Sequence, residues 1–257
     1  MPGGIFDLGC HGYNHISAND LTSSDLEHEI KDAIMRLRAL FPGQRVLTYA
    51  APNNQVNDTF IDYLNDYSIS CRIGSNGTTA VLGEKLDMYR IRGIGFSENS
   101  DFAYVQAQID TYVSRGEWVV QYFHTVTSGT PYESVGTSVD TLDAHCKVLY
   151  DKYYGKVWFG SFEEVSIYAR QHEAVKIEKG VFDADSMTFT LSCSLDKDTY
   201  NIPMTMKLYL PNGTSSYTVT VDGVTREAEL TSDENGACVL VRDLSVYGTT
   251  VKLTINN

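Results

Sequence analysis

The chain has 257 residues, 42% of them hydrophobic, which suffices for one large domain or for a medium and a small one. Acidic residues outnumber basic ones 33 to 20, and the net charge of −13 argues against a nucleic-acid partner, because phosphate contacts need an excess of Lys and Arg. No apolar run approaches the roughly 20 residues of a membrane-spanning helix, and the first residues, MPGGIFDLGC, show no signal-peptide pattern.

Two histidines stand four positions apart near the start of the chain, in the stretch FDLGCHGYNH. His11 and His15 directly follow a small hydrophobic run. Such a pair also occurs by chance in a chain with six histidines, so the spacing alone leaves two interpretations open. The two residues are either ligands of one metal ion or two solvated side chains.

Helix and strand patterns alternate up to about residue 174, which is typical of an α/β fold. Residues 24–27, SDLE, predict a capping box in front of a helix that ends before PGQ, and residues 161–171 predict a second capped helix. The other predicted helices cover 57–67, 101–116 and 139–153, and the predicted strands cover 45–52, 68–73, 117–124 and 156–160.

The strand predicted at 117–124, EWVVQYFH, is almost continuously apolar from Trp118 to Phe123. This pattern is typical of a strand buried on both faces of a parallel sheet. His124 then stands at the carboxyl end of the strand, where ligands bind in parallel α/β folds. A hydrogen-bonded core histidine is the alternative interpretation.

After Ala174 the helix signals stop, and short alternating segments separated by turn signals predict a small antiparallel β-sandwich over 175–257. Such a module could bind carbohydrate or could be a rigid appendage of the first domain, and we favour the appendage. None of the five cysteines forms a Cys-x-x-Cys pair, and only Cys193 and Cys238 are candidates for a disulfide.

Several segments, in the right order over residues 5–173, resemble the NodB-type polysaccharide deacetylases. These are the His-x-x-x-His stretch, the strand that ends in AAPNN, the buried strand that ends in YFH, and the final VWFGSFEEVSIYA. The resemblance implies an incomplete (β/α) barrel over 1–174, followed by the sandwich. Asp7 falls where the family often has a glutamate, and Gly12 and Ala50 replace a hydroxyl residue and an arginine of the family motifs.

The resemblance also implies roles for individual residues. His11 and His15 would bind a divalent metal, most often zinc, and His124 would be the general acid. Arg72 could supply the missing arginine charge from another strand and is a catalytic candidate, although a surface ion pair would also explain it. The candidate substrate-binding residues are Pro52, Asn53 and Tyr122.

One part of the family pattern is missing. A strand ending in Thr-Phe-Asp-Asp, which supplies the base and the third metal ligand, would have to precede His11, and residues 1–10 leave no room for it. The string VFDAD at 181–185 lies after the last predicted helix, and we interpret it as a turn. We therefore expect either an amino-terminal truncation of a longer protein or a gap covered by other segments.

The sequence thus predicts a metal-dependent carbohydrate deacetylase, impaired in this chain by the missing aspartates. It would remove acetyl groups from N-acetylated or O-acetylated glycans, with glycan or peptidoglycan as partner and an extracellular or cell-envelope location. A catalytically inactive, glycan-binding relative of the deacetylases is the first alternative. The second is an unrelated α/β protein in which the histidines are incidental.

Overall fold

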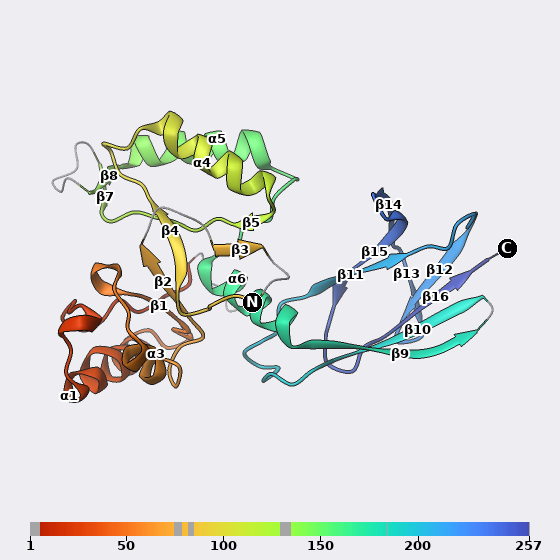
Figure 1. Ribbon diagram of the computed structural model, residues 1–257, viewed down its shortest axis with the longest axis horizontal. Helices are drawn as coiled ribbons and strands as arrows, with labels where there is room; N and C mark the ends of the chain where they lie inside the picture. Colours follow the sequence, from red (N-terminus) through yellow and green to blue (C-terminus); the bar gives the residue numbers. More distant parts are fainter. Residues whose placement is uncertain (1–5, 75–78, 82–84, 129–134, 184, 257) are drawn as a thin grey trace. The chain divides into compact units, whose positions relative to one another are not determined.

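Figure 1 shows the computed structural model of the chain. Contacts divide the chain into two compact units, Met1–Ser166 and Ile167–Asn257, and each is described by itself. The first mixes helices with a curled, half-barrel parallel sheet and the second contains antiparallel sheets, so the predicted mixed α/β class is confirmed. The residues that the structure describes are 6–74, 79–81, 85–128, 135–183 and 185–256.

A helix in three consecutive segments follows the short 3-10 turn η1 (Ala18–Asp20) in the first unit. α1 (Ser23–Leu26) continues into the π-helical segment η2 (Glu27–Asp32) and then into α2 (Ala33–Leu40). Its buried side chains recur at the predicted helical spacing, so its inner face packs into the core. A π-helical segment within an α-helix is uncommon and is often found at functional sites.

The helix begins two residues before the predicted capping box. Thr22 is the N-cap, and its backbone N–H donates to the Asp25 carboxylate at 2.9 Å. Ser24 lies inside the first turn, and Glu27 pairs with Lys31 on the exposed face. The prediction of Ser24 and Glu27 as the box is therefore wrong in position, because Thr22 offers the same capping chemistry earlier in the chain.

Four parallel strands form the sheet of the first unit, in the order β1-β2-β4-β6 (Figure 1). They are β1 (Thr48–Ala50), β2 (Ser70–Gly74), β4 (Ile91–Gly95) and β6 (Gln121–Tyr122), and every neighbouring pair is parallel. Parallel strands place all their carboxyl ends at one edge of the sheet. That edge therefore collects the residues that follow each strand.

Three helices of the first unit each begin at a polar N-cap. The Asn57 side chain accepts a hydrogen bond from the Phe60 N–H at 2.8 Å, and Asp101 and Ser138 do the same for their own helices. Such caps satisfy the free N–H groups of a first turn. The helices are α3 (Asp58–Leu64), α4 (Phe102–Ser114) and α5 (Val139–Tyr153).

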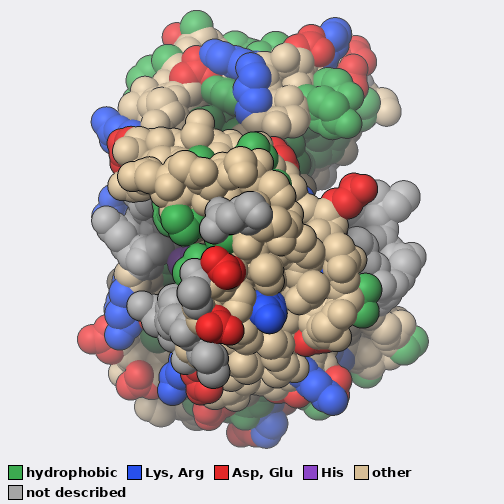
Figure 2. Space-filling model, turned by 90° about the vertical axis from the view of Figure 1, so that its right-hand side faces the viewer, with side chains coloured by type: hydrophobic (Ala, Val, Ile, Leu, Met, Phe, Trp, Pro, Cys, Tyr) green, Lys and Arg blue, Asp and Glu red, His purple; other side chains and the backbone are tan. Residues whose placement is uncertain are grey.

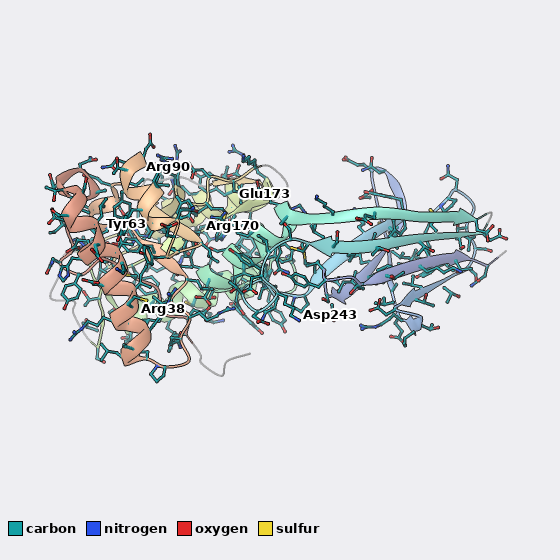
Figure 3. All side chains as sticks on the ribbon, turned by 90° about the horizontal axis from the view of Figure 1, so that it is seen from below. Arg38, Tyr63, Arg90, Arg170, Glu173 and Asp243 are labelled. Carbon is teal, nitrogen blue, oxygen red and sulfur yellow. The ribbon has the colours of Figure 1, made fainter. Side chains whose placement is uncertain are left out.

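Arginine side chains connect the helices to neighbouring loops. Arg38 on α2 donates to the carbonyls of Arg45 at 2.8 Å and of Val46 at 3.1 Å, at the start of the segment leading to β1 (Figure 3). Arg90 forms ion pairs with Asp58 at 2.6 Å and with Asp87 at 2.9 Å. Arg38 thus ties the end of α2 to the entry of the first strand.

The apolar stretch at 117–124 is not one continuous strand. Its first part, β5 (Glu117–Trp118), pairs antiparallel with β3 (Thr79–Val81), and only β6 joins the parallel sheet. Phe123, predicted to be buried, is 42% exposed. Because the segment changes partners between Trp118 and Gln121, a continuous apolar pattern could not reveal the break. A short parallel pair of β7 (Val126–Thr127) and β8 (Thr137–Ser138) follows.

The predicted strand at 156–160, KVWFG, is wrong: these residues form no strand in the structure. Trp158 is 49% exposed and Phe159 is 54% exposed. Aromatic and β-branched residues favour strands only where a neighbouring strand pairs with them, and none among the described residues does so here. α6 (Phe162–Ala174) follows as predicted, with reciprocal capping bonds between Ser161 and Glu164.

Two antiparallel sheets make up the second unit. The larger has the order β13-β12-β16-β10-β9 and the smaller the order β11-β15-β14. Both contribute side chains to one apolar core, among them Val239 and Leu253, which are fully buried. The strands are β9 (Val175–Asp183), β10 (Ser186–Cys193), β11 (Met204–Tyr209), β12 (Tyr217–Val221), β13 (Val224–Arg226), β14 (Glu229–Asp233), β15 (Gly236–Leu244) and β16 (Thr250–Ile255).

The prediction of the string VFDAD at 181–185 as a turn is wrong for its first three residues, which are the end of β9 and pair with β10, Asp183 opposite Ser186. Asp185 has a turn conformation, and Ala184 lies outside the described residues. β9 itself was not predicted, because the sequence signal for α6 runs into it without a break. Cys193 and Cys238 are free thiols, so the structure pairs neither of the candidate disulfide partners.

Charges of both signs are interspersed on the surface. Figure 2 shows Lys and Arg side chains alternating with Asp and Glu on the face that it presents. Among the described residues, no helix combines the length and the apolar character needed to cross a membrane.

Candidate active site

The carboxyl-end edge of the parallel sheet brings the predicted site residues together. Cys10 extends this sheet, because its N–H donates to the Thr48 carbonyl at 2.9 Å and its carbonyl accepts from the Ala50 N–H at 2.8 Å. Ala50 is in turn the register partner of Arg72. His11, the next residue after Cys10, therefore stands in one row with Ala50 and Arg72.

The His11–His15 loop depends on unusual backbone conformations. Gly12 has φ +84° and His15 has φ +60°, a region that residues other than glycine seldom adopt. The two imidazole rings meet edge to face, with centroids 4.7 Å apart. Nδ1 of His11 lies 2.7 Å from the Ala50 carbonyl oxygen. The loop thus directs both rings to the same place.

The side chain of Glu29 holds this loop through hydrogen bonds. It lies in the π-helical segment and is only 1% exposed, and its carboxylate accepts from the backbone N–H groups of Tyr13 and Asn14 at 3.0–3.1 Å. The Asn14 side-chain amide donates to the same carboxylate at 2.7 Å. A Cβ added at Gly12 would lie 3.1 Å from Glu29, so this close approach requires glycine.

Sequence analysis did not identify Glu29 as a site residue. The available signal was an acidic residue on the apolar face of a helix, three positions after the buried Leu26 and next to the buried Ile30. A charge at such a position needs compensating hydrogen bonds, because burial of an unsatisfied carboxylate is costly. Its three donors all come from the histidine loop.

The histidine loop supplies two ligands that suit a divalent metal ion. With Nδ1 of His11 donating to the Ala50 carbonyl, Nε2 is the nitrogen left to bind an ion, and metal-binding histidines commonly donate their other N–H in this way. His15 supplies a second imidazole. The described residues contain no cluster of three or more His, Cys, Asp or Glu that could hold a metal, so a third protein ligand is not among them.

Burial and neighbouring side chains influence the pKa of His11. Burial lowers the pKa of His11 most, the hydrogen bond to Ala50 opposes this effect, and the charges of His15, Arg72 and His124 lower the pKa further. The neutral imidazole, which is the form that binds a metal, is therefore favoured. The register of β1 and β2 places Arg72 next to Ala50, whose carbonyl oxygen contacts His11.

Arg72 and Tyr122 form a stacked pair on the inner face of the sheet. The Arg72 guanidinium carbon lies 4.3 Å from the centre of the Tyr122 ring. His124 is exposed, and its ring centre lies 6.3 Å from that of Tyr122. Burial lowers the pKa of Arg72, which the Tyr122 hydroxyl opposes. The alternative of a surface ion pair for Arg72 has no support among the described residues, since no carboxylate pairs with it.

The proline loop η3 (Pro52–Asn54) lies next to the histidine loop. Pro52 is buried, and its Cγ would lie 3.3 Å from a Cβ at Gly12. The side chain of Asn53 donates to the Ser17 hydroxyl at 2.8 Å and thereby fixes the loop. Asn54, which was not predicted, accepts from Arg72 Nη1 at 2.7 Å. Both asparagines have positive φ, a conformation in which Asn is enriched.

Neither Asp7 nor a separate apolar cavity supplies a carboxylate to the histidine pair. Asp7 accepts a hydrogen bond from the Ser161 hydroxyl at the start of α6, away from His11. A separate cavity of about 400 Å³ is lined by apolar and aromatic side chains, including Trp118, Tyr153 and Trp158. Neither contributes a carboxylate to the site.

Comparison with known proteins supports part of this picture. The model of the polysaccharide deacetylase family matches residues 2–71, which include His11, His15 and Pro52. The match confirms the resemblance over this segment and supports a deacetylase-like, glycan-acting function. No curated protein matches the chain.

Among solved structures, endo-glycoceramidase II from Rhodococcus sp., in a complex with cellobiose-like isofagomine, is 14% identical. The alignment covers 84% of this chain and 44% of that one, with a TM-score of 0.19. The chain thus spans less than half of that protein's length. A likeness this low carries no argument about function.

Proposed function

We propose that the chain is a deacetylase-like hydrolase that acts on acetylated glycans at the carboxyl-end edge of its parallel sheet. The observation that carries the proposal is the His11–His15 ring pair, with His11 oriented by the Ala50 carbonyl. Support also comes from the family match over residues 2–71. Arg72 and His124 lie outside that match, and a separate support comes from their placement, since Arg72 pairs with Ala50, which contacts His11, and Tyr122 links Arg72 to His124.

His11 and His15 would hold a divalent ion, zinc in this proposal, through Nε2 of His11 and the imidazole of His15. When bound, such an ion polarises an acetyl carbonyl and favours hydroxide at neutral pH. Burial is the largest effect that lowers the pKa of His11, and a lowered pKa favours the neutral imidazole that this task needs. The metal dependence is a proposal, because two imidazoles alone give a weak site.

The remaining residues would bind the sugar and handle its protons. His124, exposed at the end of β6, would protonate the departing sugar amine or hydroxyl as general acid. Arg72 would supply positive charge beside the reacting acetyl group, stacked on Tyr122. Tyr122, Pro52 and Asn53 would form the wall against which the sugar ring rests, since Tyr rings offer an apolar face with a polar tip.

Among the described residues no group of three or more His, Cys, Asp or Glu could hold a metal, and the Glu29 carboxylate of the loop is occupied by the N–H groups of Tyr13 and Asn14, so we propose no base from it. Loss of a positioned acid–base group removes about 10²- to 10⁴-fold of rate. We therefore expect slow hydrolysis by residues 1–257, even with zinc added. The competing proposal, a glycan-binding protein without catalysis, is favoured by this same incomplete set of groups.

Zinc binding provides the direct test. Isothermal titration with Zn²⁺ should show one site in the wild-type chain and at least tenfold weaker binding in His11→Ala and His15→Ala. His172→Ala, an exposed histidine of the second unit, is the matched control and should bind like the wild type. Equal zinc affinity in all four proteins would refute the metal site.

Acetate release then separates the enzyme from the binding protein. N-acetylglucosamine oligomers should release acetate slowly in the presence of zinc, and not at all with a chelator. Binding of the oligomers without any acetate release would favour the glycan-binding alternative. Fast release would mean that a carboxylate outside the described residues acts as the base.

The resemblance suggests an extracellular, glycan-acting protein, and we propose this location together with a peptidoglycan-type substrate. The second unit would be an accessory β-sandwich domain, for which residues 175–257 remain our predicted range. Retention of the glycan affinity by residues 1–174 would support an appendage role, provided that this fragment gives the circular dichroism of a folded protein.

A further inference from the structure

Arg72 is a half-buried guanidinium without a counter-ion among the described residues. It lies in the middle of β2, stacks on Tyr122 at 4.3 Å, and donates through Nη1 to Asn54 at 2.7 Å. No acceptor for its Nε or Nη2 is found in the part of the chain that the structure describes. Two sides of the guanidinium are thus fixed, and its remaining edge is available.

Arg45 is another half-buried arginine of the same unit, but it has a carboxylate partner. Its guanidinium pairs with the buried Glu163 at 2.7 Å, so its charge is compensated within the protein. Charge removed from water without such a partner costs several kcal/mol. Arg72 has neutral partners instead, and an anion bound to its free edge would supply the missing compensation.

A row of glycines makes room for this arrangement. A Cβ at Gly74 would lie 2.3–2.4 Å from the Asn54 side chain, so no other residue fits there without moving Asn54. A Cβ at Gly93 would lie 3.0 Å from the Tyr122 ring and 3.4 Å from Arg72 Cδ. The sheet therefore holds Asn54, Arg72 and Tyr122 in one fixed stack before any ligand arrives. Such preorganisation lowers the entropic cost of binding.

The register places this stack beside the histidine loop. Arg72 pairs with Ala50, whose carbonyl contacts His11. Tyr122, on the other side of Arg72, precedes His124 by two residues. A ligand group that binds the free edge of Arg72 would thus be adjacent to the acetyl group bound between His11 and His124.

We infer that Arg72 is the recognition residue for a carboxylate on the glycan, so that the substrate is an acetylated glycan containing an acidic sugar. A guanidinium fork matches a planar carboxylate with two parallel hydrogen bonds, and its single permanent charge matches a monoanion. The inference rests on the proposed function, because it names the substrate class of the same site. With a net charge of −13, the chain offers no general attraction to anions, so this recognition must come from local contacts.

The test compares sugars that differ in one carboxylate. The first pair is N-acetylmuramic acid and N-acetylglucosamine, which differ by a lactyl ether, and the second is glucuronate and glucose. Dissociation constants are measured by NMR titration at low salt. We expect at least tenfold tighter binding of the acidic member in one pair, and the pair that shows it identifies the source of the carboxylate.

Two variants assign the effect to Arg72. Arg72→Gln should abolish the difference within the pair, and Arg72→Lys should retain only part of it, because a lysine lacks the fork. Arg36→Gln, on the exposed face of α2, makes the same change of net charge and should preserve the difference. If Arg72→Gln fails to fold, the Nε resonance of Arg72 in the wild type takes its place, since the acidic sugar should shift it and the neutral one should not.

Three outcomes would overturn the inference. They are equal affinity within both pairs, a preference that survives in Arg72→Gln, and tighter binding of N-acetylglucosamine 6-phosphate than of either carboxylate sugar. Failure of the proposed function gives a different result: no acetate is released from any acetylated sugar while the preference for the carboxylate persists. The two ideas can therefore fail separately.

Discussion

The two flanks of the candidate site are built differently. The amino-terminal flank, residues 11–15, directly follows Cys10, which forms backbone bonds to β1, and the buried Glu29 holds the flank through Tyr13 and Asn14. The carboxyl-terminal flank, residues 122–124, follows the two-residue strand β6, and its histidine is exposed. Metal ligands need fixed geometry, whereas a general acid needs contact with substrate and solvent. The difference teaches that the histidine loop has a fixed geometry, whereas on the other flank Tyr122 is fixed against Arg72 and His124 stays exposed to solvent.

We expect the largest effect on the rate of hydrolysis from a substitution of His124 in the carboxyl-terminal flank. In His124→Ala, acetate release from N-acetylglucosamine oligomers should fall by about 10²- to 10⁴-fold, because the amine leaving group must be protonated. Hydrolysis of p-nitrophenyl acetate should change little, because nitrophenolate leaves without a proton. Rates are measured at high protein concentration with zinc present.

Stability provides the control for this variant. Because His124 is exposed, its replacement should change the free energy of unfolding by less than about 0.5 kcal/mol. Equal losses on both substrates, or a clear loss of stability, would contradict the role of His124 as general acid.

The substitution Glu29→Gln should loosen the histidine loop of the amino-terminal flank. The amide cannot accept all three donors, and loss of such charge-assisted bonds should destabilise the unit by about 2–3 kcal/mol. Denaturant unfolding measures this loss. Hydrogen exchange at Tyr13 and Asn14 should become faster in the variant.

Glu163→Gln is the matched control, because Glu163 is also buried but pairs with Arg45. It should destabilise the unit without faster exchange at Tyr13 and Asn14. Unchanged exchange in Glu29→Gln, or the same pattern in both variants, would show that Glu29 does not hold the histidine loop.

Gly93→Ala should disturb the carboxyl-terminal flank alone. The new methyl group would lie 3.0 Å from the Tyr122 ring, so the ring must move away from Arg72. Loss of the cation–π contact and the strain should cost about 1–2 kcal/mol. A crystal structure or NOE measurements should show Tyr122 displaced and the His11–His15 contact unchanged. An undisturbed Tyr122 ring would argue against tight packing at this position.

We expect the smallest effect from acid pH on the stability of α5. It would come from the buried His145, which contacts Gln121 just before the carboxyl-terminal flank. It contacts Gln121 at 3.0 Å and stacks on Phe96, and burial lowers its pKa from the ordinary value of 6.5. Below pH 6.5 the unfolded chain therefore binds this proton more readily than the folded one. The stabilising contribution of the neutral ring is present above pH 6.5 and is lost as the pH falls through the lowered pKa.

We expect hydrogen exchange in α5 to accelerate between pH 7 and pH 5, after correction for the intrinsic pH dependence of exchange. His145→Gln should weaken this response, whereas His28→Gln, at an exposed position, should preserve it. An identical pH response in wild type and His145→Gln would exclude His145 as its origin.

Part of the candidate site could be predicted from the sequence, because some of its motifs stand at the ends of predicted strands. Parallel strands gather their carboxyl ends, so Pro52 and His124, which end two predicted strands, were expected at one edge. The catalytic and metal-binding roles of these residues stay predictions. Their common location followed from local patterns and one topological rule.

The remaining features depend on contacts between segments distant in the sequence. Glu29 could be recognised only through the loop that it binds, and Asn54 only through its register with Arg72. The strand at 156–160 failed because β propensity needs a neighbouring strand. The break before β6 arises from a change of pairing partners that an apolar run does not encode.

The π-helical segment Glu27–Asp32 has a consequence for how this sequence can vary. Each residue advances a helix by about 100°, so a deletion within the segment would turn everything on one side of it relative to the other. Glu29 would then leave the apolar face while every remaining residue kept its chemical identity. Substitutions along the exposed face of this helix should therefore be tolerated far better than any change in its length. After an insertion or deletion here the helix could still pack against the core, but Glu29 would no longer hold the histidine loop.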